Sequence, residues 1–344
     1  MAQGTGAQGR PAGPGTTSDG PTAAGIPADG TGAQDGPAGS GTPSGSATPG
    51  GEAAPSSAPS ADPAHDAASN NDATRLDASG FSTLVVQERA DRVHARLHRP
   101  AVRNAIDQTM VDELHAVCAH LEAHPKVLIL SGTPASVAPG GKGIFASGAD
   151  IAQLRERRRD DALAGINSAV FDRIAKLPMP VIAALEGYAL GGGAELAYAA
   201  DFRIGTESLR VGNPETGLGI MAAAGATWRL RELVGEPLAK EVLLAGKVLT
   251  GEQCLAAGLV TELVEPEQLL PAAHALADRI AAQDPLAVRI SKAVFHTPRE
   301  VHPLIDTLAQ GMLFESQAKF DRMQAFLDKK TNGTGSKKTD GKKQ

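Results

Sequence analysis

Aromatic residues are scarce in this chain of 344 residues, which has one Trp, two Tyr and eight Phe. Residues 1–78 contain no aromatic residue, but hold 15 of the 39 glycines and 10 of the 23 prolines. A segment of this composition has too little apolar surface to offset the entropy cost of folding. We therefore predict that residues 1–78 form a disordered arm rich in Ala, Gly, Pro, Ser and Thr.

Basic residues are not in excess. The formal net charge is −6, and residues 1–78 account for all of it, with eight acidic side chains against Arg10 and Arg75. The remaining chain is nearly neutral, which argues against a nucleic-acid partner. The end of the chain, residues 331–344, is lysine-rich and is expected to be a solvated, disordered tail.

Long apolar runs are missing as well. No stretch of 18 apolar residues occurs, and the N-terminus has no basic stretch followed by an apolar one, so we expect no membrane span, no targeting segment and a cytoplasmic protein. The chain has two cysteines, Cys118 and Cys254, far apart in apolar contexts, which favours buried thiols over a disulfide. The histidines lack the spacing of metal ligands, and no metal site is expected.

The remaining 250 or so residues alternate strands and helices before a run of helices. Leu84–Glu88 and Val93–Leu97 are predicted as paired strands, a helix follows Asp107, and Val127–Leu130 is a buried strand. From Pro237 onward the pattern is helical, with Leu304–Leu327 read as one segment. The order predicts an α/β core over residues 79–265, built from strand-strand-helix units, and a helical region over residues 266–330.

The stretch from Pro180 to Asp201 carries the strongest local pattern. An apolar strand leads through Gly191, Gly192 and Gly193 into a helix that contains Glu195. Glycines allow positive φ and a close ligand approach, and the first N–H groups of a helix are unpaired, which suits a negative oxygen. The same glycines are also typical of close helix packing, and the local residues leave both interpretations open. A dinucleotide-binding loop is disfavoured, because Gly-x-Gly-x-x-Gly is absent.

Two further stretches can belong to one site with it. Ser147-Gly148-Ala149-Asp150-Ile151 is a second turn of small residues entering a helix, so Ala149 can expose a backbone amide. Two such amides aimed at one oxygen form an oxyanion hole. Asn213-Pro214-Glu215 presents a second carboxylate, and two carboxylates beside a polarised carbonyl are suited to proton transfer. No serine in a glycine elbow points to a serine hydrolase.

From Phe81 to Lys330 the chain resembles the crotonase family of enoyl-CoA hydratases and isomerases. The matching segments follow the family order throughout: Leu97-His98-Arg99-Pro100, Asn104-Ala105, Ser147 to Ile151, Pro180 to Ala184, Gly187 to Leu196, Asp201, Pro214-Glu215, Gly217 to Ile220, Ala256 to Val260 and Ala325-Phe326-Leu327. The resemblance implies a spiral of ββα units with a C-terminal helical trimerisation region. It also implies a homotrimer or a dimer of trimers.

The resemblance also implies roles for particular residues. Ala149 and Gly192 match the two oxyanion-hole amides, and Glu195 and Glu215 match the two glutamates of the hydratases, Glu195 acting on water and Glu215 supplying a proton to the α-carbon. Ser147, Ala149, Asp150 and Ile151 match the segment along the coenzyme A adenine. Phe326 and Lys329 match positions that close over the nucleotide, often from a neighbouring subunit. Coenzyme A enters only as part of the acyl-CoA substrate, and no separate cofactor is implied.

The chain departs from the family in two places. Relatives usually follow Gly219 with an Ile-Pro-Gly-Ala-Gly-Gly-Thr type of loop, where this chain has Ile220-Met221-Ala222-Ala223-Ala224-Gly225-Ala226-Thr227. The exchange of a proline and two glycines for alanines changes the backbone freedom of a loop beside the water site. Lysines that often meet the coenzyme A phosphates are also absent, and Arg103 or Arg155 to Arg159 are candidates to replace them. Isomerisation, other enolate chemistry and a non-catalytic acyl-CoA-binding subunit therefore stand as alternatives to hydration.

Overall fold

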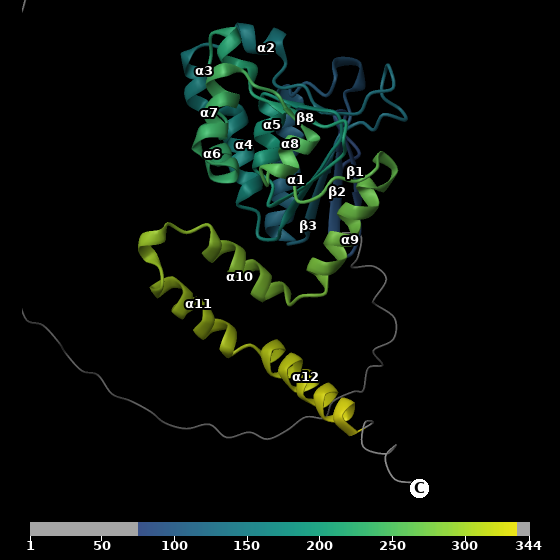
Figure 1. Ribbon diagram of the computed structural model, residues 1–344, viewed down its shortest axis with the longest axis vertical. Helices are drawn as coiled ribbons and strands as arrows, with labels where there is room; N and C mark the ends of the chain where they lie inside the picture. Colours follow the sequence, from purple (N-terminus) through teal and green to yellow (C-terminus); the bar gives the residue numbers. More distant parts are fainter. Residues whose placement is uncertain (1–74, 336–344) are drawn as a thin grey trace, which may run out of the picture. The chain divides into compact units, whose positions relative to one another are not determined.

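The computed structural model of the chain describes residues 75–335 (Figure 1). The predicted arm up to residue 74 and the end after residue 335 lie outside the described residues. Leu76 belongs to the folded part, since its side chain packs on the core and its N–H donates to Glu88 Oε2 over 2.7 Å.

A five-stranded sheet forms the centre of the fold, in the order β1-β2-β3-β5-β7. β1 and β2 pair antiparallel and the other neighbours pair parallel. β3 and β5 are buried at every residue, as is typical of strands covered on both faces. The bounds are β1 Leu84–Glu88, β2 Arg92–Leu97, β3 Val127–Ser131, β5 Val181–Leu185 and β7 Phe202–Gly205.

A second sheet of four short strands has the order β4-β6-β8-β9. The first three strands pair parallel, and β9 is antiparallel to β8. Their bounds are β4 Ile144–Ala146, β6 Tyr188–Leu190, β8 Arg210–Gly212 and β9 Leu249–Thr250. β4, β6 and β8 each follow a strand of the first sheet along the chain and precede a helical segment. This confirms the α/β fold of strand-strand-helix units.

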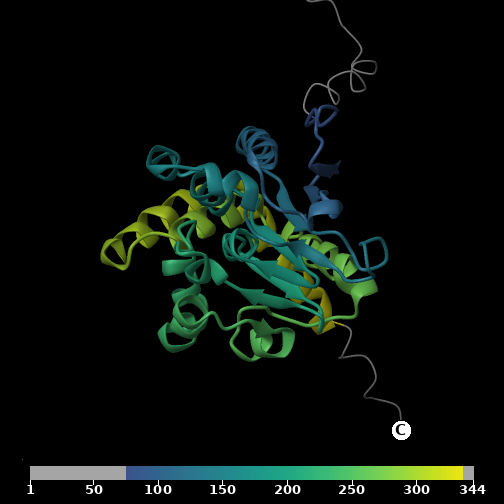
Figure 2. The same cartoon turned by 90° about the horizontal axis from the view of Figure 1, so that it is seen from above.

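Helices surround the strands, and Figure 2 shows the teal strands with helices from earlier and later parts of the chain around them. Asp107 caps α1 as predicted, accepting a bond from Met110 N over 2.9 Å. Cys118 and Cys254 are buried free thiols. The bounds are η1 Pro100–Val102, α1 Gln108–Ala123, α2 Ile151–Glu156, α3 Arg159–Ala164, α4 Ile166–Ala175, α5 Gly192–Tyr198, η2 Pro214–Leu218, α6 Ala226–Val234, α7 Glu236–Ala245, α8 Gly251–Ala256 and η3 Pro266–Gln268.

The last helices are α9 Leu269–Ala281, α10 Pro285–Phe295, η4 Arg299–Val301, α11 Leu304–Phe314 and α12 Gln317–Gly335. α9 packs on the five-stranded sheet, where Leu276 and Ala277 share a cluster with Ile129 and Ile182. α10 is held by buried Lys292, whose Nζ donates to Asp201 Oδ2 over 2.7 Å. None of the described helices has the length and apolarity needed to span a bilayer.

The expectation of one helical segment over Leu304–Leu327 is wrong, because the chain breaks between α11 and α12. Ser316 explains the break. Its Oγ accepts a bond from Lys319 N over 3.3 Å, so it caps a new helix instead of continuing the old one. α12 then runs past Lys330 to Gly335, into the segment predicted as a disordered tail.

Candidate active site

The turn between β4 and α2 leaves the amide of Ala149 free. Ile106 N donates to Gly148 O over 2.8 Å, and Asp150 N donates to Ile106 O over 2.9 Å. These two bonds flank Ala149, whose own N–H consequently faces away from Ile106. Gly148 has a φ of +110°, which permits the turn. Asp150 then caps α2 by accepting bonds from Ala152 N and Gln153 N.

The three consecutive glycines at the start of α5 are each required, or tolerated, for a different structural reason. Gly191 takes a φ of +52° and a ψ of −127°, a conformation that is restricted to glycine. A Cβ on Gly193 would lie 2.4 Å from the Ala146 carbonyl oxygen, so this glycine allows α5 to pack on β4. Gly192 has neither constraint, since its φ is ordinary and a Cβ there would meet nothing closer than 3.4 Å.

The space beside Gly192 is the point where the two predicted amides meet. A Cβ on Gly192 would lie 3.5 Å from Ala149 N, and covalent geometry sets it about 2.5 Å from Gly192 N. Gly192 is the first residue of α5, so its N–H has no acceptor within the helix. The structure thus brings Ala149 and Gly192 together, with both backbone nitrogens near the position of that Cβ.

Glu195 is buried, with 3% of its surface exposed. Its Oε1 accepts bonds from Ala224 N over 2.7 Å and from Ala226 N over 3.1 Å. Burial raises the pKa of Glu195 to about 7, and the nearby Glu215 adds to the rise, against the lowering effect of the two amide bonds. A carboxyl with a pKa near neutrality can take up and release a proton at physiological pH.

Glu215 lies on η2 directly after Pro214 and is 9% exposed. Its Oε1 would be 2.9 Å from a Cβ on Gly191, so the carboxyl reaches the glycine turn. Its buried Oε2 has no hydrogen-bond partner among the described residues, and burial raises the pKa of the carboxyl. Asn213 supports this segment, because its Oδ1 accepts a bond from buried Tyr198 OH over 3.0 Å.

The altered loop keeps its contact with Glu195. Within the described chain, positive φ outside glycine occurs only at Arg103 and Asn104, so none of the loop alanines is strained. Gly225, the residue of the loop with a φ of +122°, is still glycine. The changes to alanine therefore leave intact the backbone that presents two amides to Glu195.

A cavity of about 430 Å³ adjoins this loop. It is lined by α3, α4, α6 and the loop itself, including Leu163, Ala169, Ala223, Trp228 and Arg229. Trp228 is 49% exposed and not part of the core, with the Arg229 guanidinium 4.0 Å from its ring centre. A hollow with both apolar and polar lining, including Asp172, thus lies next to the loop that holds Glu195.

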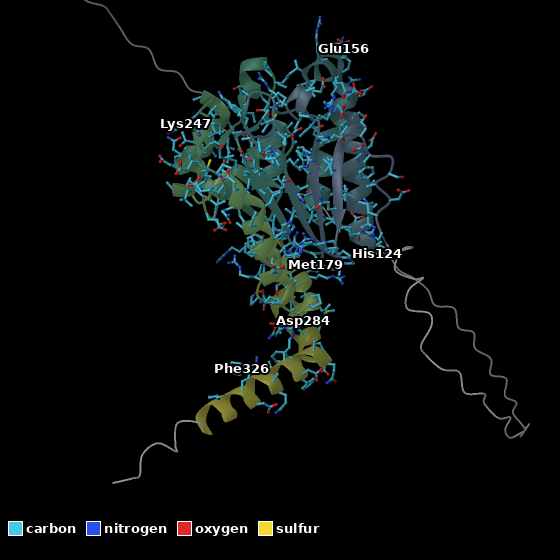
Figure 3. The ribbon with its side chains drawn as sticks, turned by 90° about the vertical axis from the view of Figure 1, so that its right-hand side faces the viewer. His124, Glu156, Met179, Lys247, Asp284 and Phe326 are labelled. Atoms are coloured by element: carbon cyan, nitrogen blue, oxygen red, sulfur yellow. The ribbon has the colours of Figure 1, made fainter. Side chains whose placement is uncertain are left out.

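The other predicted binding residues fall into two groups. Arg103 and Ser147 are adjacent, since Ser147 N donates to Arg103 O over 3.1 Å, and Ser147 to Ile151 continue into α2 beside the Ala149 amide. The Ile151 side chain is 60% exposed. Phe326 and Lys329, by contrast, lie on α12, and Figure 3 shows Phe326 well away from Glu156 at the end of α2. A single copy of the chain does not bring these two residues to the site.

The sequence interpretation missed Asn167, on the first turn of α4. Its Nδ2 would lie 3.4 Å from a Cβ on Gly192, and its buried Oδ1 has no hydrogen-bond partner among the described residues. A lone asparagine in a helix gives no signal of such a role, because its position depends on how α4 packs beside α5. The amides of Ala224 and Ala226 were missed for the same reason.

Comparisons with known proteins agree with this geometry. A model of the family described as enoyl-CoA hydratase/isomerase matches residues 91–333. The crotonyl-CoA hydratase of Syntrophomonas wolfei is 34% identical over 258 residues, covering 73% of this chain and 96% of the relative. The 2,3-dehydroadipyl-CoA hydratase of Escherichia coli is 33% identical, covering 73% of this chain and 98% of the relative.

Solved structures show the same likeness. The crystal structure of an enoyl-CoA hydratase from Bacillus anthracis superposes with a TM-score of 0.66 at 29% identity, covering 72% of this chain and 97% of that one. On the evidence of its motifs, its fold and these relatives, the chain belongs to the enoyl-CoA hydratase/isomerase (crotonase) family.

Proposed function

We propose that this chain hydrates a trans-2-enoyl-CoA to a 3-hydroxyacyl-CoA. One observation carries the proposal: two buried carboxyls, Glu195 and Glu215, lie beside the turn where the free amides of Ala149 and Gly192 meet. Membership of the family supports an acyl-CoA ligand, and the relatives named as hydratases support the reaction.

In this proposal the two amides hold the thioester carbonyl oxygen and stabilise the negative charge that develops on it. Glu195 accepts a proton from water as the water oxygen attacks C3, and Glu215 gives a proton to C2. The net change is the addition of H and OH across the C2–C3 double bond. Each carboxyl then needs one proton returned or removed to restore the starting state.

The surroundings of the carboxyls favour this division of roles. Burial raises the pKa of both carboxyls, and that of Glu195 to about 7. Two amides donate to Glu195, which favours the charged form there, whereas Glu215 Oε2 has no hydrogen-bond partner among the described residues. Glu195, with its pKa raised to about 7, becomes charged as the pH rises through neutrality, as its role as the base requires.

Incubation with crotonyl-CoA tests the proposal, with loss of the enoyl-thioester absorbance as the readout. We expect turnover that falls by about 100-fold or more in Glu195→Gln and in Glu215→Gln. Glu186→Gln is the matched control, because Glu186 is also a buried glutamate whose burial raises its pKa, but its Oε1 binds Ala135 N. Absence of turnover in a protein that still binds butyryl-CoA would refute hydration. Loss of activity in Glu215→Gln with full activity in Glu195→Gln would instead favour isomerisation by one carboxylate.

We also propose that the chain assembles as a homotrimer or a dimer of trimers. α11 has no buried residue in the single chain, and the large apolar side chains Leu308, Met312, Phe320, Met323 and Phe326 on α11 and α12 are more than half exposed. Apolar surface of this extent supports burial against further copies. Size-exclusion chromatography with light scattering measures the mass of the assembly in solution, and the mass of a monomer would contradict the proposal.

A further inference from the structure

Asn167 occupies an unusual place in this site. Gly165, with a φ of +65°, ends α3 and starts α4, so Asn167 stands at the second position of α4. Its Oδ1 is one of two buried side-chain atoms without a hydrogen-bond partner among the described residues, and the other is Glu215 Oε2. An unpaired buried polar atom destabilises the fold, and natural proteins retain such atoms mainly at functional sites.

Both side chains reach the glycine turn through their other polar atom, Glu215 Oε1 and Asn167 Nδ2. Glu215 reaches the position of a Cβ on Gly191, and Asn167 Nδ2 reaches within 3.4 Å of the position of a Cβ on Gly192. The second position is also 3.5 Å from Ala149 N. Three nitrogen donors therefore lie around the position of that Cβ: the backbone amides of Ala149 and Gly192, and the side-chain amide of Asn167.

We propose that Asn167 Nδ2 donates a third hydrogen bond to the thioester oxygen and acts mainly on the enolate. A carbonyl oxygen has two lone pairs, which the two backbone amides already occupy. An enolate oxygen carries negative charge and accepts a further donor. A bond that forms fully only with the enolate raises kcat and leaves substrate binding nearly unchanged. This inference rests on the proposed function insofar as an acyl thioester occupies the site.

Steady-state kinetics with crotonyl-CoA provide the first test. Asn167→Leu keeps the size of the side chain and removes the donor, and we expect kcat to fall by about 10- to 100-fold with KM changed by less than about threefold. Ser168→Ala is the control on the same turn, because the Ser168 hydroxyl binds Gly165 O within the helix start. Asn167→Asp should lose more activity than Asn167→Leu, because a carboxylate repels the enolate. Asn167→Asp also provides the test of the inference if Asn167→Leu fails to fold.

Binding of two non-reacting thioesters separates this inference from the hydration proposal. Acetoacetyl-CoA forms an enolate that imitates the intermediate, whereas butyryl-CoA offers only a carbonyl. We expect Asn167→Leu to weaken binding of the enolate by about 10-fold or more and binding of butyryl-CoA by less than about threefold. This result is expected even if the wild-type protein does not hydrate crotonyl-CoA.

Three outcomes would overturn the inference. Equal weakening of both thioesters would assign Asn167 a structural role. Unchanged enolate binding would remove Asn167 from the oxyanion site. A variant that changes only the preference among acyl groups, at constant enolate binding, would make Asn167 a contact for the acyl chain.

Discussion

Replacement of Gly192 by alanine tests the position of the thioester oxygen with the least disturbance of the fold. The new Cβ would be 3.4 Å from Asn167 Nδ2 and 3.5 Å from Ala149 N, which are ordinary contact distances. The φ of Gly192 lies outside the left-handed region, and alanine is the better helix former by up to about 1 kcal/mol. We therefore expect Gly192→Ala to fold with a free energy of unfolding within about 1 kcal/mol of the wild type.

Activity should respond very differently. A ligand oxygen that accepts from Ala149 N and Gly192 N needs N···O distances of about 2.9 Å, and the new methyl group occupies the space beside both nitrogens. We expect the methyl group to displace the oxygen from at least one donor, and loss of one such donor typically lowers kcat by about 100- to 1,000-fold. The contrast between unchanged stability and lost activity is the expected result.

The neighbouring glycines provide matched comparisons. Alanine at Gly193 would place a Cβ 2.4 Å from the Ala146 carbonyl oxygen, and alanine at Gly191 would adopt a φ of +52°. Both changes should lower the free energy of unfolding by about 1–3 kcal/mol. Urea denaturation measures stability and the crotonyl-CoA assay measures activity. A Gly192→Ala protein with full activity would refute our placement of the thioester oxygen.

Four further predictions concern charged groups. Folding raises the pKa of Glu195 from 4.5 to about 7, so the folded protein binds this proton more tightly than the unfolded chain. As the pH rises from 4.5 to 7, the wild type should therefore lose up to about 3 kcal/mol of stability relative to Glu195→Gln. Urea midpoints that shift in parallel for both proteins would contradict this. With catalysis by charged Glu195, kcat/KM should rise with pH through about 7, and a flat profile would argue against Glu195 as the base. Glu215→Gln should lower kcat by about 100-fold or more while butyryl-CoA binding stays within threefold, and a matching loss of binding would assign it a structural role. Asp201→Ala should destabilise the fold by about 3 kcal/mol, because it leaves the Lys292 side chain without its carboxylate partner. Urea denaturation measures the loss, and a loss below about 1 kcal/mol would show that this ion pair does not hold α10 in place.

The sequence by itself determined the fold class and the order of the site segments. Apolar runs such as Val181–Leu185 and the capping residue Asp107 act locally, so their strand and helix are visible without coordinates. Family motifs then singled out Ala149, Gly192, Glu195 and Glu215 as candidates, and the structure brings them into one region.

Only the tertiary structure decided which residues contact one another across distant parts of the sequence. Three adjacent glycines look alike in sequence, yet Gly191 adopts a backbone conformation restricted to glycine, Gly193 allows packing on β4 and Gly192 lies beside the Ala149 amide. The sequence does not point to Asn167, because its place in the site depends on α4 lying beside the start of α5. Whether the alanine-containing loop contacts Glu195 was also decided by the tertiary structure, because only the folded backbone shows that the amides of Ala224 and Ala226 donate to Glu195. Contacts between distant segments depend on how those segments pack, which no single stretch of sequence determines.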